Sequence, residues 1–525
     1  MRSRPRSLFL VAGLVSALSL APARARAAAP PGEVAGEVAR DLDPYVTQAL
    51  ATWKVPGAAI AIVKDGRVVL ARGFGVRAAG RPERVDEHTS FAIASLSKGF
   101  TAAALGLLVE EGRLGWDDPV VRHWPGFAVA DPTVTRELTI RDLLAHRSGL
   151  GPESDALWSY AGYGREEILA RLRFLGQGAG LRASFSYQNV LYLVAGEVLA
   201  ARSGQRWEEF VATRLLAPLD MCSSSTSGKP LPGSTNVAQP HSDTGDPPEA
   251  RPIQAEDSTP VSPAAALHSS AADLAHWLLM LLDRGQYAGR RVLQPATVDA
   301  LFTPQMLIDF EPALKALYPE SHFQAYGLGW VVQDYRGRLV VWNTGGLHGM
   351  ACSTALIPEE RLGVVVLTNG PRISLPEALV FRVLDGYLGA GPPAKDWSGL
   401  RLKASLARRA RLAEAERAAE AARVRGTRPT LSLERYAGVY EQPLLGRVTV
   451  SPPARDGRVT LQVARGLVGD LSHWHYDTFR IVWRNPLYGT SLATFALDPN
   501  GAPSRLFIEE LGDFRREKAG EARTH

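Results

Sequence analysis

Two residues with the chemistry of a nucleophile and a base, Ser95 and Lys98, stand three positions apart before an apolar stretch over 100–109. If this segment is a helix, side chains at positions i and i+3 lie on one face. A lysine buried there would have a lowered pKa and could act as a base toward the serine hydroxyl. The helix N-terminus would also favour negative charge near Ser95. Taken alone, however, the motif fits a helix-capping serine and a surface lysine slightly better.

A tyrosine and an asparagine two positions apart, Tyr187 and Asn189, precede a second apolar helical stretch over 190–199. In a loop, side chains at this spacing can point into one cleft. Tyr187 could then relay a proton, and Asn189 could bind a substrate amide or Lys98. The simpler interpretation is a packing tyrosine and a helix-capping asparagine.

The third candidate is the segment Asn343-Thr344-Gly345-Gly346, at the end of an apolar strand pattern. Its two glycines permit a close approach between the backbone and a ligand. A backbone N–H in this segment could complete an oxyanion hole with the N–H of Ser95. The alternative is a glycine turn within a hairpin.

In combination and in this order, Ser-x-x-Lys, Tyr-x-Asn and a strand ending in Thr-Gly resemble the motifs of the serine β-lactamase and penicillin-binding protein superfamily. The resemblance is to class C β-lactamase-like serine hydrolases, which include carboxylesterases, D-aminopeptidases and DD-peptidases. It covers about residues 40–385. Other stretches of similar character lie at 55–57, 143–150, 266–274, 326–330 and 365–369.

The resemblance implies a role for each motif. Ser95 would be acylated, with Lys98 as its base, and Tyr187 would move the proton to the leaving group and back to water. The N–H groups of Ser95 and Gly346 would hold the oxyanion. Residues of the second and third motifs would bind or orient the substrate: Asn189, Asn343, Thr344, Gly345 and Gly346.

The third motif departs from the family pattern at its first position, which is usually Lys, His or Trp and here is Asn343. A lysine would help to hold a substrate carboxylate, so its absence argues against efficient turnover of β-lactams or D-Ala-D-Ala peptides. We expect an enzyme that cleaves a small ester or a D-amino-acid peptide without metal or cofactor. His146 lies in a family-like stretch, and we interpret it as structural. The rival hypothesis is a catalytically weak, penicillin-binding-like binding or sensing module.

The order of patterns along the chain predicts an α+β domain over 28–390, with an antiparallel sheet flanked by helices and a helical subdomain. Two apolar runs over 58–63 and 67–71 form a hairpin signal around an Asp-Gly pair. Helical patterns follow within 95–285, and strand patterns return within 326–368, the first of them over 326–333. The helices would therefore stand between two parts of one sheet.

The composition changes after residue 390. Within the linker 391–430, an Ala-, Arg- and Glu-rich helical pattern over 400–425 indicates a solvated connector helix. Residues 431–525 carry short alternating patterns separated by turn residues, which predict a small all-β, barrel-like C-terminal domain. This part resembles a β domain of unassigned role that is appended to such hydrolases.

Residues 1–27 are typical of a secretory signal peptide, with arginines at the start, an apolar run and a small-x-small cleavage site. The apolar run is shorter than the roughly 20 residues of a membrane span. We therefore expect export to the periplasm or the extracellular medium, with no stable membrane span after cleavage. This segment holds five of the 59 basic residues, and the other 54 balance the 54 acidic residues. Charge thus gives no reason to expect a nucleic-acid partner.

The remaining candidates are two cysteines and a histidine pair. Cys222 and Cys352 could form a disulfide, but two buried thiols are the simpler interpretation. His473 and His475 have no third ligand nearby in a known metal-binding motif, so we expect no metal site. The expected partner is a small-molecule or peptide substrate, and the oligomeric state stays open.

Overall fold

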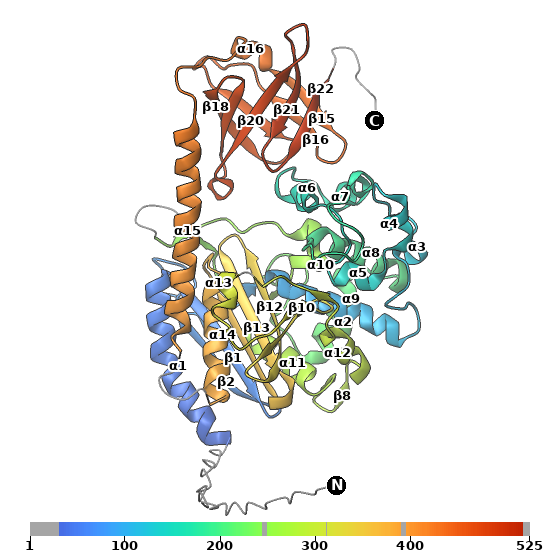
Figure 1. Ribbon diagram of the computed structural model, residues 1–525. Coiled ribbons are helices and arrows are strands. Elements are labelled where there is room, and N and C mark those ends of the chain that lie inside the picture. The colour runs from blue at the N-terminus through green and yellow to red at the C-terminus, as the bar shows by residue number, and fades with distance from the viewer. Residues whose placement is uncertain (1–30, 244–248, 311, 390–394, 518–525) are drawn as a thin grey trace, which may run out of the picture.

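The computed structural model describes residues 31–243, 249–310, 312–389 and 395–517 (Figure 1). They form an α+β domain, a long helix and a β-barrel, in that order along the chain. The expected signal peptide over 1–27 lies outside the described residues. Within them, no helix combines the length and the apolar character that crossing a bilayer requires.

The first domain is built on an eight-stranded antiparallel sheet in which early and late segments of the chain are neighbours. Strand β1 pairs with β14 from Ala58 opposite Thr368 to Lys64 opposite Leu362. The helical region therefore stands between two parts of one sheet, which confirms the prediction. In sheet order the strands are β2 (Arg67–Gly75), β1 (Gly57–Lys64), β14 (Leu362–Thr368), β13 (Met350–Ile357), β12 (Arg338–Leu347), β11 (Val331–Tyr335), β10 (Gln324–Tyr326) and β9 (Met306–Leu307).

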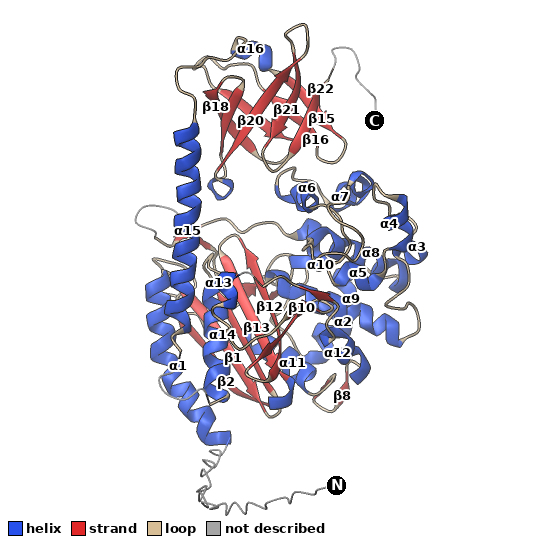
Figure 2. Cartoon of the chain, viewed as in Figure 1, coloured by secondary structure: helices blue, strands red, loops and turns tan. Residues whose placement is uncertain are grey.

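Helices cover both faces of the sheet (Figure 2). Successive side chains of a strand point to opposite faces, so alternate residues of β1 enter two different cores. Ile60 and Ile62 pack in a core with the helices α1 (Pro31–Trp53) and α14 (Ser374–Tyr387). Ala59, Ala61 and Val63 belong to the other core, which contains the helical region.

Two nearly buried helices, α2 (Ser97–Glu110) and α8 (Asn189–Ser203), form the centre of the helical region. Each is apolar around most of its circumference, as expected for a helix enclosed by other elements. They pack against each other and against the short helix α10. Further helices of this region include α5 (Ile140–Leu144), α6 (Ala156–Ser159), α7 (Arg165–Arg171), α10 (Ser262–Ala265), α11 (Ala271–Leu282) and α12 (Pro295–Phe302).

The C-terminal domain is a closed barrel of eight antiparallel strands, each paired with its neighbours in the chain. Alternate residues point inward and are buried, for example Val448, Leu461, Ile481 and Phe495. Side chains therefore fill the interior, as is usual at this strand number. The strands are β15 (Gly438–Gln442), β16 (Gly446–Val450), β17 (Val459–Val463), β18 (Val468–His475), β19 (Thr478–Trp483), β20 (Thr490–Leu497), β21 (Pro503–Ile508) and β22 (Gly512–Arg516).

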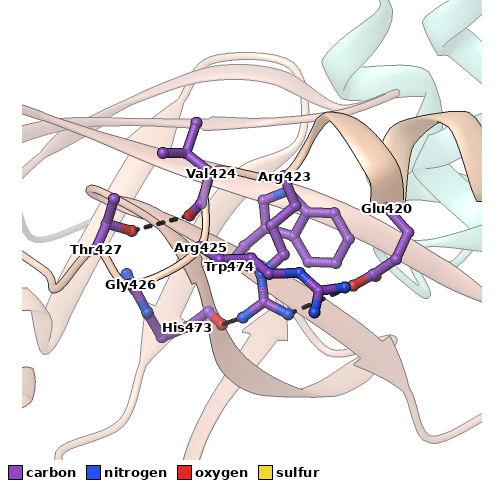
Figure 3. A pocket seen from close by; sticks show the side chains of 8 residues that line it. All are labelled: Glu420, Arg423, Val424, Arg425, Gly426, Thr427, His473 and Trp474. Carbon is purple, nitrogen blue, oxygen red and sulfur yellow. Dashed lines mark hydrogen bonds and ion pairs between the residues drawn. The ribbon is translucent and has the colours of Figure 1, made fainter.

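Helix α15 (Trp397–Ala422) connects the two domains and is anchored at both ends. At its start Trp397 is fully buried and donates a hydrogen bond to Asp385 at 2.8 Å. Just beyond its end, the Arg423 guanidinium lies 4.9 Å from the Trp474 ring and donates to the carbonyls of His473 and Trp474 (Figure 3). The helix is thus held by the domain at each end.

The barrel also docks directly on the helical region, beside α6 and α7 (Figure 1). The Tyr163 hydroxyl donates to the carbonyl of Leu445 at 3.0 Å. On the barrel side, the Tyr488 hydroxyl donates to the carbonyl of Ser159 at 2.9 Å. Backbone hydrogen bonds join the same surfaces, including one from the N–H of Leu467 to the carbonyl of Tyr160. Two separate attachments therefore position the barrel.

Two sequence-based expectations need correction. The strand predicted over 326–333 is divided between β10 and β11, because Gly329 has a φ of +83°, which is incompatible with a strand. The two cysteines are free, and only Cys352 is buried whereas Cys222 is exposed. The prediction of two buried thiols is therefore wrong for Cys222, and no disulfide joins the pair.

We expect the anchor of α15 to contribute strongly to stability. Replacing Trp397 with alanine should lower the free energy of unfolding by about 3–5 kcal/mol, because it leaves a large cavity. Leu406 lies on the same helix and is 52% exposed, so Leu406→Ala should change the free energy by less than about 0.5 kcal/mol. Denaturant unfolding of both variants tests this prediction. Equal losses in the free energy of unfolding would contradict an anchoring role for Trp397.

Candidate active site

Ser95 lies in a tight turn, η1 (Ala94–Leu96), that leads directly into α2. The preceding Ala94 has a φ of +47°, in the left-handed region that costs a non-glycine residue roughly 1–3 kcal/mol. Backbone bonds hold the turn, since the N–H of Ile93 donates to the carbonyl of Leu267 at 2.9 Å. Such strain is characteristic of residues whose position serves a site.

Lys98 is fully buried, and its amine meets three oxygen atoms. Nζ lies 3.0 Å from Oγ of Ser95, 2.7 Å from Oδ1 of Asn189 and 3.1 Å from the carbonyl of Ala264. Burial lowers the pKa of Lys98 to about 7, and the charge of Asp155 opposes this shift. Near neutral pH the amine can therefore release its proton and accept that of Ser95.

Tyr187 approaches Ser95 from the other side, and its hydroxyl donates to Oγ at 2.8 Å. The surrounding protein raises the pKa of Tyr187 above its ordinary value of 10, although 40% of the residue is exposed. The phenol therefore keeps its proton at neutral pH. Of the two groups at Oγ of Ser95, the Lys98 amine can therefore act as a base and the Tyr187 phenol as a proton donor.

The imidazole ring of His146 packs against the ring of Tyr187. Its ring centroid lies 4.3 Å from that of Tyr187, and its Nδ1 accepts a hydrogen bond from the N–H of Gln188 at 3.2 Å. Burial holds the pKa of His146 well below its ordinary value, so the ring is neutral. The geometry agrees with the structural interpretation of His146, because it fixes the loop that carries Tyr187.

Asn189 begins α8 and bridges the lysine to the carboxylate of Asp155. Its Oδ1 accepts from Lys98, while its Nδ2 donates to Oδ2 of Asp155 at 2.7 Å. The backbone N–H of Asn189 donates to Oδ1 of the same aspartate at 3.0 Å. Burial raises the pKa of Asp155, and the hydrogen bonds from Asn189 oppose the shift. Our sequence analysis missed Asp155, which lies 34 residues before Asn189 in a segment without a recognisable motif.

The third motif lies on β12, beside the turn that carries Ser95. The ladder to β11 ends at Trp342, so the segment after it has no strand partner on that side. Nδ2 of Asn343 donates to the carbonyls of Ser95 and Gly329, and Oδ1 accepts from the N–H of Thr344. The asparagine amide therefore binds the protein's own backbone, and it braces the turn that carries Ser95 against β12.

Gly345 allows this close contact between β12 and the turn. A Cβ atom at this position would lie 2.4 Å from the carbonyl oxygen of Ile93 and 3.1 Å from the backbone nitrogen of Ser95. At Gly346 a Cβ would meet only the flexible end of the Ile373 side chain. The first glycine is thus a steric requirement of the site.

The described residues contain no group of three or more His, Cys, Asp or Glu side chains placed to hold a metal ion. His473 and His475 lie at the end of β18, where Nε2 of His473 is 3.0 Å from the carbonyl oxygen of Tyr476. The groups that hydrogen-bond to Oγ of Ser95 are the Lys98 amine and the Tyr187 phenol.

A sheet divided by a helical region, with a serine, a lysine and a tyrosine converging at its edge, defines the serine β-lactamase and penicillin-binding protein fold class. Residues 42–382 match the family model described as Beta-lactamase. The chain belongs to the β-lactamase family, and membership supports serine hydrolase activity in general. Residues 422–520 match a domain of unknown function, DUF3471.

Two relatives among characterised proteins illustrate the range of the family. Unguisins hydrolase ungD of Aspergillus violaceofuscus is 28% identical over 376 residues, which cover 68% of this chain and 65% of that protein. Protein flp of Staphylococcus aureus is 26% identical over 344 residues, which cover 63% of each chain. The chain thus matches slightly less than two thirds of the length of either relative.

Two solved structures share the fold. The octameric penicillin-binding protein homologue from Pyrococcus abyssi superposes with a TM-score of 0.59 at 22% identity, covering 91% of this chain and 99% of that one. SurE superposes with a TM-score of 0.54 at 21% identity, covering 93% and 99%. Both likenesses confirm the predicted architecture.

The lysine pKa predicts the pH dependence of the reaction. Below pH 7 Lys98 is protonated and cannot act as a base, so kcat/KM for an activated ester should rise with pH, with a midpoint near 7. The Asp155 charge raises the pKa of the lysine, so Asp155→Asn should move the midpoint to lower pH. Asp456→Asn, on the barrel surface, serves as the control and should leave it unchanged. An unshifted midpoint in Asp155→Asn would contradict the coupling.

The glycine geometry predicts unequal effects of two neighbouring substitutions. Gly345→Ala should lower kcat/KM roughly 100-fold, because displacement of the nucleophile by about 1 Å costs that much. Gly346→Ala retains the N–H and displaces only a flexible side chain, so its loss should be far smaller. Thermal unfolding of both variants checks that they fold, and similar kinetic losses would refute the steric argument.

Proposed function

We propose that this protein is a serine hydrolase that cleaves an ester or amide through an acyl-enzyme on Ser95. The observation that carries the proposal is the pair of hydrogen bonds at Oγ, one with Nζ of Lys98 and one with the Tyr187 hydroxyl. A structural serine would need neither a buried amine nor a phenol at this distance. The arrangement supplies a base and an acid to the same atom.

In acylation, unprotonated Lys98 accepts the proton of Ser95 while Oγ forms a bond to the substrate carbonyl carbon. The remaining N–H donors of Lys98 point to Asn189 and Ala264, which fixes its lone pair toward the serine. Negative charge develops on the carbonyl oxygen, and the N–H groups of Ser95 and Gly346 are the proposed donors to it.

Tyr187 completes the proton path. When the bond to the leaving group breaks, its phenol donates a proton to the departing oxygen or nitrogen, and Lys98 restores that proton. In deacylation the same groups act in reverse, removing a proton from water as it attacks the acyl carbon and returning Oγ–H to Ser95. No cofactor takes part in these steps.

Within this activity we propose a small ester or a D-amino-acid peptide as the substrate, rather than a β-lactam. The amide of Asn343 is engaged with the backbone of Ser95 and Gly329. The first position of the motif therefore carries no cation for a substrate carboxylate. Thr344, Gly345 and Gly346 then serve as neutral substrate contacts. The unguisins hydrolase relative is, by its name, also a hydrolase.

We further propose that the chain is exported. The composition of residues 1–27 supports this, because basic residues precede an apolar run and a small-x-small site. N-terminal sequencing of protein from the periplasm or medium, after expression of the full chain, would locate the cleavage.

The decisive experiment is intact-mass analysis after incubation with p-nitrophenyl esters, a D-Ala p-nitroanilide, nitrocefin and a fluorophosphonate. We expect an adduct or turnover in the wild type and a loss of at least about 1,000-fold in Ser95→Ala, because no other nucleophile replaces the hydroxyl. Ser472→Ala, at an exposed serine on β18 of the barrel, is the matched control and should retain labelling.

Absence of any adduct in folded wild-type protein would overturn the proposal. It would instead favour the binding or sensing module, for which the fold is retained without acylation.

A further inference from the structure

A pocket of about 410 Å³ opens directly beyond the third motif. It is lined by Ala92, three residues before Ser95, and by Leu347, the residue after the paired glycines. Most of its other lining side chains are apolar, among them Val237, Ile253 and Met350. The pocket is therefore placed to receive an apolar group from a molecule bound at the serine.

Five polar side chains also line this pocket: Gln239, Gln254, Glu256, His268 and His348. His268 is 8% exposed, and its Nδ1 is buried without a well-formed hydrogen bond. Burial lowers the pKa of His268 to about 4, so the ring is neutral at physiological pH. The pocket thus offers a mainly apolar lining with a few polar groups, of which only Glu256 is a carboxylate, and it suits an uncharged side chain.

A second pocket of about 280 Å³ continues from the first, and the barrel forms its far wall. The two share the segment 254–256 and His348. The barrel supplies Leu467, Leu487 and Tyr488. Together the pockets form one groove, whose volume lies within the roughly 300–1,000 Å³ of typical ligand sites.

Contacts between the two domains hold the barrel wall in place. The Tyr488 ring lies 4.9 Å from the ring of Tyr160 and 5.8 Å from that of His348. His348 in turn pairs with Glu256, with 3.3 Å between Nδ1 and Oε2. The groove is therefore built before any ligand binds, which reduces the entropy cost of binding.

The charged side chains that line the second pocket are acidic. Among the described residues, Glu256 and Asp257 line this pocket and no lysine or arginine does. Trp158 and Tyr488 add aromatic surface on which a cation or a neutral group can rest. An anionic ligand would meet unfavourable charge here.

We propose that the barrel is part of the substrate site, and that this groove binds a peptide chain extending from the group acylated on Ser95. An apolar side chain occupies the first pocket, and a neutral or positively charged residue lies between Tyr488 and Glu256. The inference rests on the proposed function and narrows its two substrate classes to one, a peptide rather than a small ester. It also assigns a role to the DUF3471 barrel, whose own interior is filled.

The test compares rates of Ser95 labelling by a minimal ethyl fluorophosphonate and by the same warhead carrying acetyl-Lys-Leu, followed by intact mass. The wild type should react faster with the peptidyl probe. Ala255 is exposed and lines both pockets, so Ala255→Trp should obstruct the groove and lower the ratio of the two rates roughly tenfold. Ala410→Trp, on the exposed face of α15, is the matched control and should retain the ratio.

Three further variants test the barrel wall and the acidic charge separately. Tyr488→Ala should lower the ratio by a similar factor, while Tyr488→Phe keeps the ring and should lower it less. An acetyl-Glu-Leu probe should react more slowly than acetyl-Lys-Leu in the wild type, and Glu256→Gln should reduce that difference.

The outcomes distinguish the two proposals. If the ratio of the two labelling rates is unchanged in both Ala255→Trp and Tyr488→Ala, the proposal that the groove binds substrate is overturned. The proposed acyl-enzyme mechanism would still stand. An equal loss with both probes would also overturn it, because the damage would then lie at Ser95 itself. Failure of the minimal probe to label the wild type would instead overturn the proposed function.

Discussion

The site depends on a buried amine with no carboxylate in direct contact. Lys98 bonds only to neutral oxygen atoms, those of Ser95, Asn189 and Ala264, among the described residues. Asp155 stands one residue further away, bonded through Asn189. A carboxylate in direct contact would hold the lysine in its charged form, whereas this arrangement satisfies its hydrogen bonds and keeps the pKa near 7. The proposed acyl-enzyme chemistry requires that balance, because a permanently charged lysine could not be a base.

The rest of the first domain can be understood as the support for this arrangement. Helices α2 and α8 bring Lys98 and Asn189 together, and their enclosure in the core removes water from the amine. Strand β12 contacts the turn that carries Ser95 through Asn343 and Gly345. The strained backbone at Ala94 persists because these contacts on every side outweigh its cost.

The barrel has a different relation to the site. Its interior is filled by its own side chains, so any contribution to binding comes from its outer loops. Those loops lie against the helical region through Tyr488 and Leu467, next to the end of β12. The anchored helix α15 and this docking surface hold the barrel from two directions, which makes a fixed wall physically reasonable.

Local patterns in the sequence determined much of this protein. The Ser95–Lys98 spacing, the hairpin of β1 and β2, the connector helix and the alternating barrel strands are all local, because backbone geometry repeats within a few residues. Only the tertiary structure decided the position of Asp155 beside Asn189, the inward use of the Asn343 amide and the barrel wall at Tyr488. These contacts join residues from 34 to over 300 positions apart, and their formation depends on which buried polar groups find partners once the whole chain has packed.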